Sequence, residues 1–97
     1  GGIVIRRNLD IKIQEKVNRV LKRSVEFAFN NPNSSYTYVK KYAQELEDDV
    51  IKKHIDLYVN QFTENLGEEG KSAIKKLYEV ASKEGIISPV RDDIFVD

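Results

Sequence analysis

The sequence has no cysteine, no methionine and no tryptophan, and only one histidine and two prolines among its 97 residues. Without cysteine the chain can form no disulfide and carry no thiolate chemistry, which is typical of a reducing compartment, so we expect a cytoplasmic protein. Without methionine it does not carry its own start, and we expect it to be a fragment of a longer protein. No apolar run approaches the roughly 20 residues of a membrane span, so we expect no membrane partner.

The charge balance is even, with 16 basic and 16 acidic residues, and 40% of the chain is hydrophobic. This composition is ordinary for a globular chain, and the length allows one domain at most. Residues 1–30 hold seven Lys and Arg against three Asp and Glu. Such a basic surplus can indicate a nucleic-acid surface, but in a chain of this size it more often means a solvated face. We therefore expect no nucleic-acid partner.

The periodicity predicts a mainly α chain, with about four helices after one N-terminal strand. The β-branched run Ile3–Ile5 reads as a strand that has nothing else in the sequence to pair with. Apolar residues at helical spacing, together with capping residues, predict helices over four ranges: 10–29, 36–46, 47–67 and 68–84. The domain organisation expected is a strand and lead-in over 1–9, a helical part over 10–89 and an extended tail over 90–97.

The range 47–67 is the most clearly marked of these helices. It opens with three carboxylates, which favour the positive end of a helix dipole, and two of them have a lysine four residues on. Gly67 supplies a residue that closes many helices in the left-handed conformation. One apolar stripe is expected to face inward, formed by Ile51, Ile55, Tyr58, Phe62 and Leu66, and Leu57 widens it.

His54 and Tyr58 are the candidate ligand-proximal residues of this helix. His54 and Asp56 are about 200° apart at helical pitch, so they cannot form a local catalytic pair or a two-ligand metal clip. One interpretation is that His54 and Tyr58 are amphipathic edge residues, apolar in body with a polar tip. The other is that they reach a ligand held mostly by parts of a larger protein.

The sequence contains no recognisable motif for catalysis, phosphate binding or metal binding. The chain has no glycine-rich phosphate loop, nucleophile elbow, zinc spacing or calcium loop. We therefore predict no metal site and no cofactor. Pattern and composition alone indicate a mainly helical fragment of unstated function.

A set of short motifs, taken together, is more specific than any single feature. They are Gly2-Ile3-Val4-Ile5-Arg6-Arg7, Val17-Asn18-Arg19-Val20, Ser24-Val25-Glu26-Phe27-Ala28, Ala43-Gln44-Glu45, His54-Ile55-Asp56-Leu57-Tyr58-Val59-Asn60 and Leu66-Gly67-Glu68-Glu69-Gly70. In this order the chain resembles the C-terminal part of the 1,4-dihydroxy-6-naphthoate synthases of menaquinone biosynthesis. The run that begins at His54 and the glycine-rich run after it are the specific part of this resemblance.

The resemblance implies a parent protein with the two-lobed α/β fold of type II periplasmic binding proteins. It implies a lyase of the futalosine pathway that converts cyclic dehypoxanthinyl futalosine to 1,4-dihydroxy-6-naphthoate, with substrate bound between the lobes and no cofactor. Gly1 and Gly2 resemble the end of a loop that borders this cleft, so we expect them near substrate. The acid–base groups would lie outside this chain, and no catalytic residue is identified within it.

Two further hypotheses stay open from the sequence. The parent could be a non-catalytic ligand-binding protein of similar fold, or the chain could be a free-standing helical interaction module. In every case we expect the isolated chain to lack synthase activity. We also expect it to self-associate as a dimer, because a lone strand and uncovered apolar faces invite a second copy.

Overall fold

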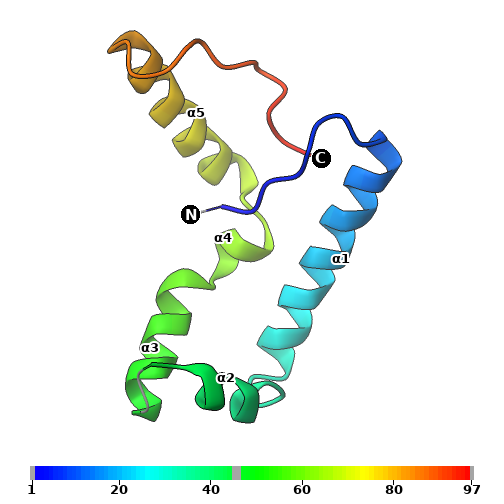
Figure 1. Ribbon diagram of the computed structural model, residues 1–97, viewed down its shortest axis with the longest axis vertical. Coiled ribbons are helices and arrows are strands. Elements are labelled where there is room, and N and C mark those ends of the chain that lie inside the picture. The colour runs from blue at the N-terminus through cyan, green and yellow to red at the C-terminus, as the bar shows by residue number, and fades with distance from the viewer. Residues whose placement is uncertain (1, 45–46, 97) are drawn as a thin grey trace. The chain divides into compact units, whose positions relative to one another are not determined.

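The computed structural model describes residues 2–44 and 47–96, and the regular structure in these ranges is helical (Figure 1). The helices are α1 (Ile11–Asn30), α2 (Tyr36–Tyr42), α3 (Asp48–Tyr58), α4 (Gln61–Glu64) and α5 (Gly67–Lys83). The chain divides into two compact units. One consists of Gly1–Asn18 with Leu66–Asp97, and the other of Arg19–Asn65.

The predicted N-terminal strand is wrong. None of the residues 2–44 and 47–96 lies in a β-strand, and residues 2–6 have no regular structure. Ile3 and Val4 are 74% and 92% exposed, whereas Ile5 is half-buried. A β-branched run favours the extended conformation, but a strand also needs a neighbour to complete its hydrogen bonds. The described part of the chain supplies no such neighbour.

Helix α1 begins as its sequence predicts. The side-chain Oδ1 of Asp10 accepts a hydrogen bond from the backbone N–H of Lys12 at 2.8 Å. The backbone carbonyl of the same residue accepts from Ile13 at 2.9 Å. An aspartate at this position satisfies N–H groups that have no partner inside the helix. The predicted helix over 10–29 is thus confirmed to within one residue at each end.

The predicted single helix over 47–67 is wrong, because α3 ends at Tyr58 and α4 starts at Gln61. Asn60 causes the break. Its side-chain Oδ1 accepts from the N–H of Phe62 at 3.0 Å, while its own N–H donates to Oγ1 of Thr63 at 3.0 Å. These two bonds form a capping box that starts a new helix at the point where the apolar stripe predicts continuation.

Glycine ends one helix as expected but not another. Gly67 takes the left-handed conformation, with φ of 60°, yet it is the first residue of α5 and does not close α3. Gly85, which follows the C-cap residue Glu84 of α5, has φ of 71°, and the N–H of Ile86 donates back to the carbonyl of Ala81 at 2.9 Å. The helix predicted over 68–84 is therefore confirmed, with the expected glycine at its end.

Helix α2 is shorter than the predicted range 36–46. It ends at Tyr42, and Ala43 is extended, with φ of −70° and ψ of 140°. Residues 45 and 46, which the prediction placed in this helix, lie outside the described residues.

The tail after α5 has neither helix nor strand over residues 84–96. It is nevertheless attached to its own unit: Asn18 Nδ2 donates to the carbonyl of Val96 at 2.9 Å, and Arg7 binds Asp93. Phe95 is half-buried, and the ammonium groups of Lys71 and Lys75 lie 5.7 and 6.0 Å from its ring centroid. The apolar residues of the tail thus find part of their cover within this unit.

Few side chains are buried in either unit. Among the described residues, Ile51 is the buried hydrophobic side chain, at 8% exposure, and Gln14 is the buried polar one, at 9%. The accessible surface is 8596 Å², whereas two separate compact units of half this mass would expose about 7,000 Å². Leu57, which was expected to face inward, is 68% exposed. In the stripe predicted to face inward, Ile51 is buried, whereas Ile55, Tyr58 and Phe62 are exposed.

Across the described residues, no helix combines the length and the apolar character that crossing a bilayer requires.

Candidate functional site

A hollow of about 420 Å³ adjoins His54 within the second unit. Helix α3 contributes Ile51, which is the best buried residue nearby, and α2 with its exit contributes Val39 and Ala43. The full lining is Val39, Ala43, Gln44, Val50, Ile51, His54 and Ile55. This hollow is mainly aliphatic, and an imidazole and an amide are its hydrogen-bonding side chains. Such a lining fits an apolar group better than an ion.

His54 and Tyr58 are in ring contact on α3. Their ring centroids are 4.7 Å apart and the ring planes are inclined by 45°. They are one helical turn apart, which places residues at this spacing in contact. Both are exposed, Tyr58 at 63%, so the pair is open to whatever lies against α3.

Two acidic residues of α3, Asp48 and Asp56, have hydrogen-bond partners other than His54. Asp56 is on another side of the helix, where it accepts from Nζ of Lys52 at 2.9 Å. Asp48, which was expected to pair with Lys52, instead binds residues of α2. Among the described residues, no group of three His, Asp or Glu side chains is placed to hold a metal ion. His54 can donate or accept a hydrogen bond, but among residues 2–44 and 47–96 no neighbouring carboxylate makes it part of a catalytic pair.

The contact between α2 and the start of α3 is polar. The Asp48 carboxylate accepts from the hydroxyl of Tyr36 at 2.7 Å and from Nζ of Lys40. The hydrogen bond from Lys40, and then that from Tyr36, lowers the pKa of Asp48, and the same contact raises the pKa of Lys40. Both partners are largely exposed, so the pair positions α2 beside the hollow and contributes little to stability.

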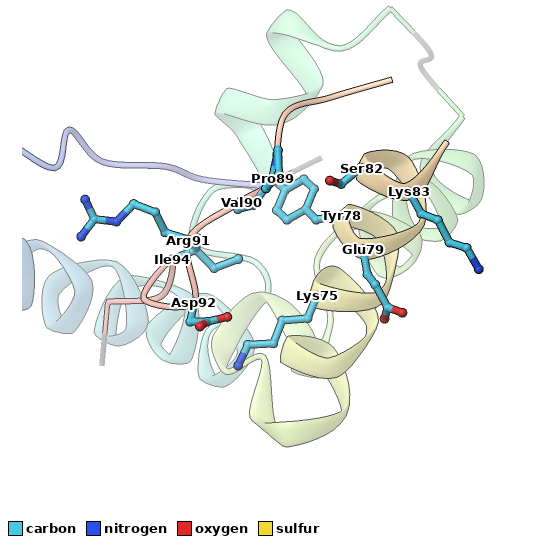
Figure 2. A pocket seen from close by; sticks show the side chains of 10 residues that line it. All are labelled: Lys75, Tyr78, Glu79, Ser82, Lys83, Pro89, Val90, Arg91, Asp92 and Ile94. Atoms are coloured by element: carbon cyan, nitrogen blue, oxygen red, sulfur yellow. The ribbon is translucent and has the colours of Figure 1, made fainter. Parts of the chain in front are cut away.

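A second hollow of about 500 Å³ lies in the first unit, between α5 and the tail (Figure 2). Tyr78 and Pro89 lie on its apolar side, whereas the charged ends of Lys83 and Arg91 point away from it (Figure 2). Its lining is Lys75, Tyr78, Glu79, Ser82, Lys83, Pro89, Val90, Arg91, Asp92 and Ile94. The mixture of charges gives no preference for a ligand of one sign.

The tail beside this second hollow is fixed by a cluster of charged groups. Arg91 donates two hydrogen bonds of 2.8 Å to the Asp93 carboxylate, a bidentate arrangement, and Arg7 donates to the Asp93 carbonyl at 2.7 Å. The Arg91 guanidinium lowers the pKa of Asp93 to about 2. The cluster joins the N-terminal segment to the tail. Its two guanidinium groups, those of Arg7 and Arg91, both bind Asp93.

Gly1 and Gly2 are the two residues predicted to border a substrate cleft. Gly1 lies outside the described residues. Gly2 is exposed, and a Cβ added there would meet nothing within 4 Å. The chain itself therefore does not require glycine at position 2, and the assignment of Gly1 and Gly2 to a substrate cleft stays a prediction.

The position of α2 beside His54 was not predicted from the sequence. The signal was present, since Val39 and Ala43 are four residues apart, a spacing that indicates a shared apolar face. The spacing alone does not show which other element packs against these two residues. In the structure these two residues line the hollow together with Ile51 and His54, so His54 is the candidate residue that meets another element there.

Comparison with known proteins gives a consistent result. A family model described as menaquinone biosynthesis matches residues 1–83. A 1,4-dihydroxy-6-naphthoate synthase of Thermus thermophilus is 35% identical over 96 residues, which covers 99% of this chain and 35% of the relative. A synthase of the same name from Streptomyces coelicolor is 38% identical over 93 residues, which covers 96% of this chain and 33% of the relative.

The chain thus spans about a third of the length of the curated relatives it matches. No solved structure matches it significantly, so the two-lobed fold implied by the resemblance stays a prediction.

Proposed function

The chain belongs to the menaquinone biosynthesis family, and from this premise we propose that it works as part of a 1,4-dihydroxy-6-naphthoate synthase. The observation that carries the proposal is the similarity to two synthases, at 35% and 38% identity, over nearly the whole chain. The alternatives, a non-catalytic binding protein and a free-standing helical module, have no comparable support. The proposed protein is a lyase of the futalosine pathway that converts cyclic dehypoxanthinyl futalosine to 1,4-dihydroxy-6-naphthoate.

Within such an enzyme we assign this chain a supporting role. Its one histidine is exposed and has no carboxylate partner among the described residues, and Asp56 and Asp48 bind lysines. General acid–base catalysis needs a group within hydrogen-bond reach of the transferred proton and a tuned pKa. The groups that meet this need would come from the two-thirds of a synthase that this chain does not match.

A gene replacement in Thermus thermophilus tests the proposal. The segment of the synthase gene that matches this chain is exchanged for the coding sequence of the chain, and menaquinone is measured by mass spectrometry. We expect menaquinone to persist in the exchanged strain. The control is a strain in which the same segment is replaced by a flexible linker of equal length, where menaquinone is lost.

One result would contradict the proposal. If the exchanged synthase accumulates as a folded protein and yet makes no menaquinone, the chain does not perform the work of the segment it resembles.

A further inference from the structure

The first unit is built from two pieces that are far apart in the sequence. One piece is residues 2–18, which hold the lead-in and the start of α1, and the other is residues 66–96, which hold α5 and the tail. Residues 19–65, which form the second unit, separate them along the chain. Direct contacts between the two pieces are therefore needed to hold the first unit together.

Arg7 is the residue through which the first of these pieces reaches the second. Its backbone carbonyl accepts from Nε2 of the buried Gln14 at 3.2 Å, and the same amide donates to the carbonyl of Leu9 at 2.8 Å. These bonds fix the end of the lead-in on α1. The guanidinium of Arg7 donates to the Asp93 carbonyl at 2.7 Å and to the Asp93 carboxylate at 3.4 Å. A residue anchored on α1 by its backbone thus binds the tail by its side chain.

Asp93 receives hydrogen bonds from two arginines at once. Arg91 donates to both carboxylate oxygens, each at 2.8 Å, and this bidentate contact fixes the orientation of the carboxylate that Arg7 also binds. A single exposed ion pair stabilises a fold very little. Here the carboxylate and the backbone carbonyl of one residue are bound together, so the contact sets a geometry as well as a charge balance.

The three residues after Asp93 attach the tail to both pieces. Ile94 is half-buried and lines the second hollow beside α5 (Figure 2). The ring of Phe95 is half-buried, and two lysine ammonium groups of α5 lie 5.7 and 6.0 Å from its centroid. The carbonyl of Val96 accepts from Nδ2 of Asn18 on α1 at 2.9 Å. Four consecutive residues of the tail therefore contact the lead-in, α1 and α5.

We propose that residues 93–96 act as a clasp that holds α5 to the start of α1, with Asp93 as its central residue and Arg7 as the group that it captures. Because the tail also lines the second hollow, the clasp fixes the shape of that hollow. The inference does not rest on the proposed function, since each of these contacts lies within the first unit.

The clasp lies beyond the part of the chain that the family model matches, which is residues 1–83. The alignment with the Thermus synthase covers 96 residues, or 99% of this chain, so it reaches into the tail. The tail therefore has a counterpart in a synthase although the family model leaves it out. We expect the clasp to be a feature of synthases of this kind.

A distance measurement by electron paramagnetic resonance tests the proposal. The chain has no cysteine, so Ile11→Cys on α1 and Leu77→Cys on α5 can carry two spin labels. These positions are 58% and 65% exposed, and both belong to the first unit. The labelled chain is diluted into unlabelled chain, so that distances between different copies do not contribute.

The width of the distance distribution is compared among variants of the labelled chain. Asp93→Ala and Arg7→Ala each remove one side of the central contact, and a further variant combines them. Asp92→Ala is the matched control, because it removes the same charge from the adjacent position. Within residues 2–44 and 47–96, Asp92 forms no hydrogen bond or ion pair.

We expect one narrow distribution in the unsubstituted chain and in Asp92→Ala. Asp93→Ala and Arg7→Ala should each give a distribution about twice as wide or wider, because the two pieces are then joined mainly through the second unit. The double variant should be no wider than either single variant, since both remove the same contact. Circular dichroism at 222 nm should stay unchanged, because no helical residue of the chain is altered by these substitutions.

Three results would overturn the proposal. They are a distribution that is already broad in the unsubstituted chain, an unchanged width in Arg7→Ala, and equal broadening in Asp92→Ala and Asp93→Ala. If Asp93→Ala loses its helical signal, Arg7→Ala decides the question, because Arg7 lies outside the helices and its substitution leaves the contact between Arg91 and Asp93 in place.

Discussion

Truncation of Ile51 is the perturbation for which the structure gives the clearest expectation. Ile51 is 8% exposed and lies on α3 against the residues that α2 contributes to the first hollow. Ile51→Ala removes three carbon atoms, and burial of each stabilises a fold by about 0.8 kcal/mol. Truncations in closed cores cost about 2–5 kcal/mol because a cavity remains. Ile51 already borders a hollow of about 420 Å³, so we expect the low end, about 2 kcal/mol.

Leu57→Ala is the matched control, because it removes the same number of carbon atoms from the same helix. Leu57 is 68% exposed, so about a third of its apolar contribution is at stake, or less than about 1 kcal/mol. The free energy of unfolding of the isolated chain is measured by urea titration with circular dichroism at 222 nm. We expect Ile51→Ala to lower the urea midpoint by about 1–2 M and Leu57→Ala to lower it by less than half as much. Equal shifts for the two variants would refute the orientation of α3 described above.

The remaining predictions concern backbone conformation, pH and association. Gly67→Ala should destabilise the isolated chain by about 1 kcal/mol or more, because Gly67 has φ of 60°. Gly2→Ala should leave the free energy of unfolding unchanged, because a Cβ at this position would meet no atom within 4 Å. Equal unfolding midpoints for the two variants would contradict this prediction. The pKa of Asp93 in the folded chain is about 2, below the ordinary aspartate value of 3.8, so its contribution to stability is present above pH 3.8 and is lost as the pH falls toward 2. Carboxyl NMR should show the depressed pKa, and Arg91→Ala should return it to the ordinary range; a titration near 3.8 without the substitution would contradict the bidentate contact. We also expect the isolated chain to self-associate at high micromolar concentration because many large apolar side chains are exposed, and a monomeric mass by light scattering at that concentration would count against it.

Much of the helical structure could be predicted from local sequence. Asp10 satisfies free N–H groups at the start of α1, and Gly85 supplies the left-handed residue after α5. Both effects act over a few residues and need no knowledge of the rest of the fold. The break at Asn60 is equally local, yet it was missed because the apolar stripe continues through it. A capping residue with a hydroxyl three positions later was the signal for a new helix start.

The errors that remain come from contacts beyond the reach of the local pattern. Ile3–Ile5 has the composition of a strand, but a strand exists only where a second one completes its hydrogen bonds. The spacing of apolar residues predicted α1, but it could not show that Leu21 is half-buried whereas its neighbour Val20 is 57% exposed. The contact between His54 and Tyr58 follows from their spacing, whereas the hollow beside them depends on where α2 turns.

The central claim is that this chain performs the work of the synthase segment it resembles, and the most direct test is turnover by a purified chimera. The chimera carries this chain in place of the matching segment of the Thermus synthase, and product is measured by mass spectrometry. We predict that it converts cyclic dehypoxanthinyl futalosine to 1,4-dihydroxy-6-naphthoate, whereas the isolated chain does not. A chimera that folds with an unfolding midpoint close to that of the Thermus synthase but forms no product would contradict the claim.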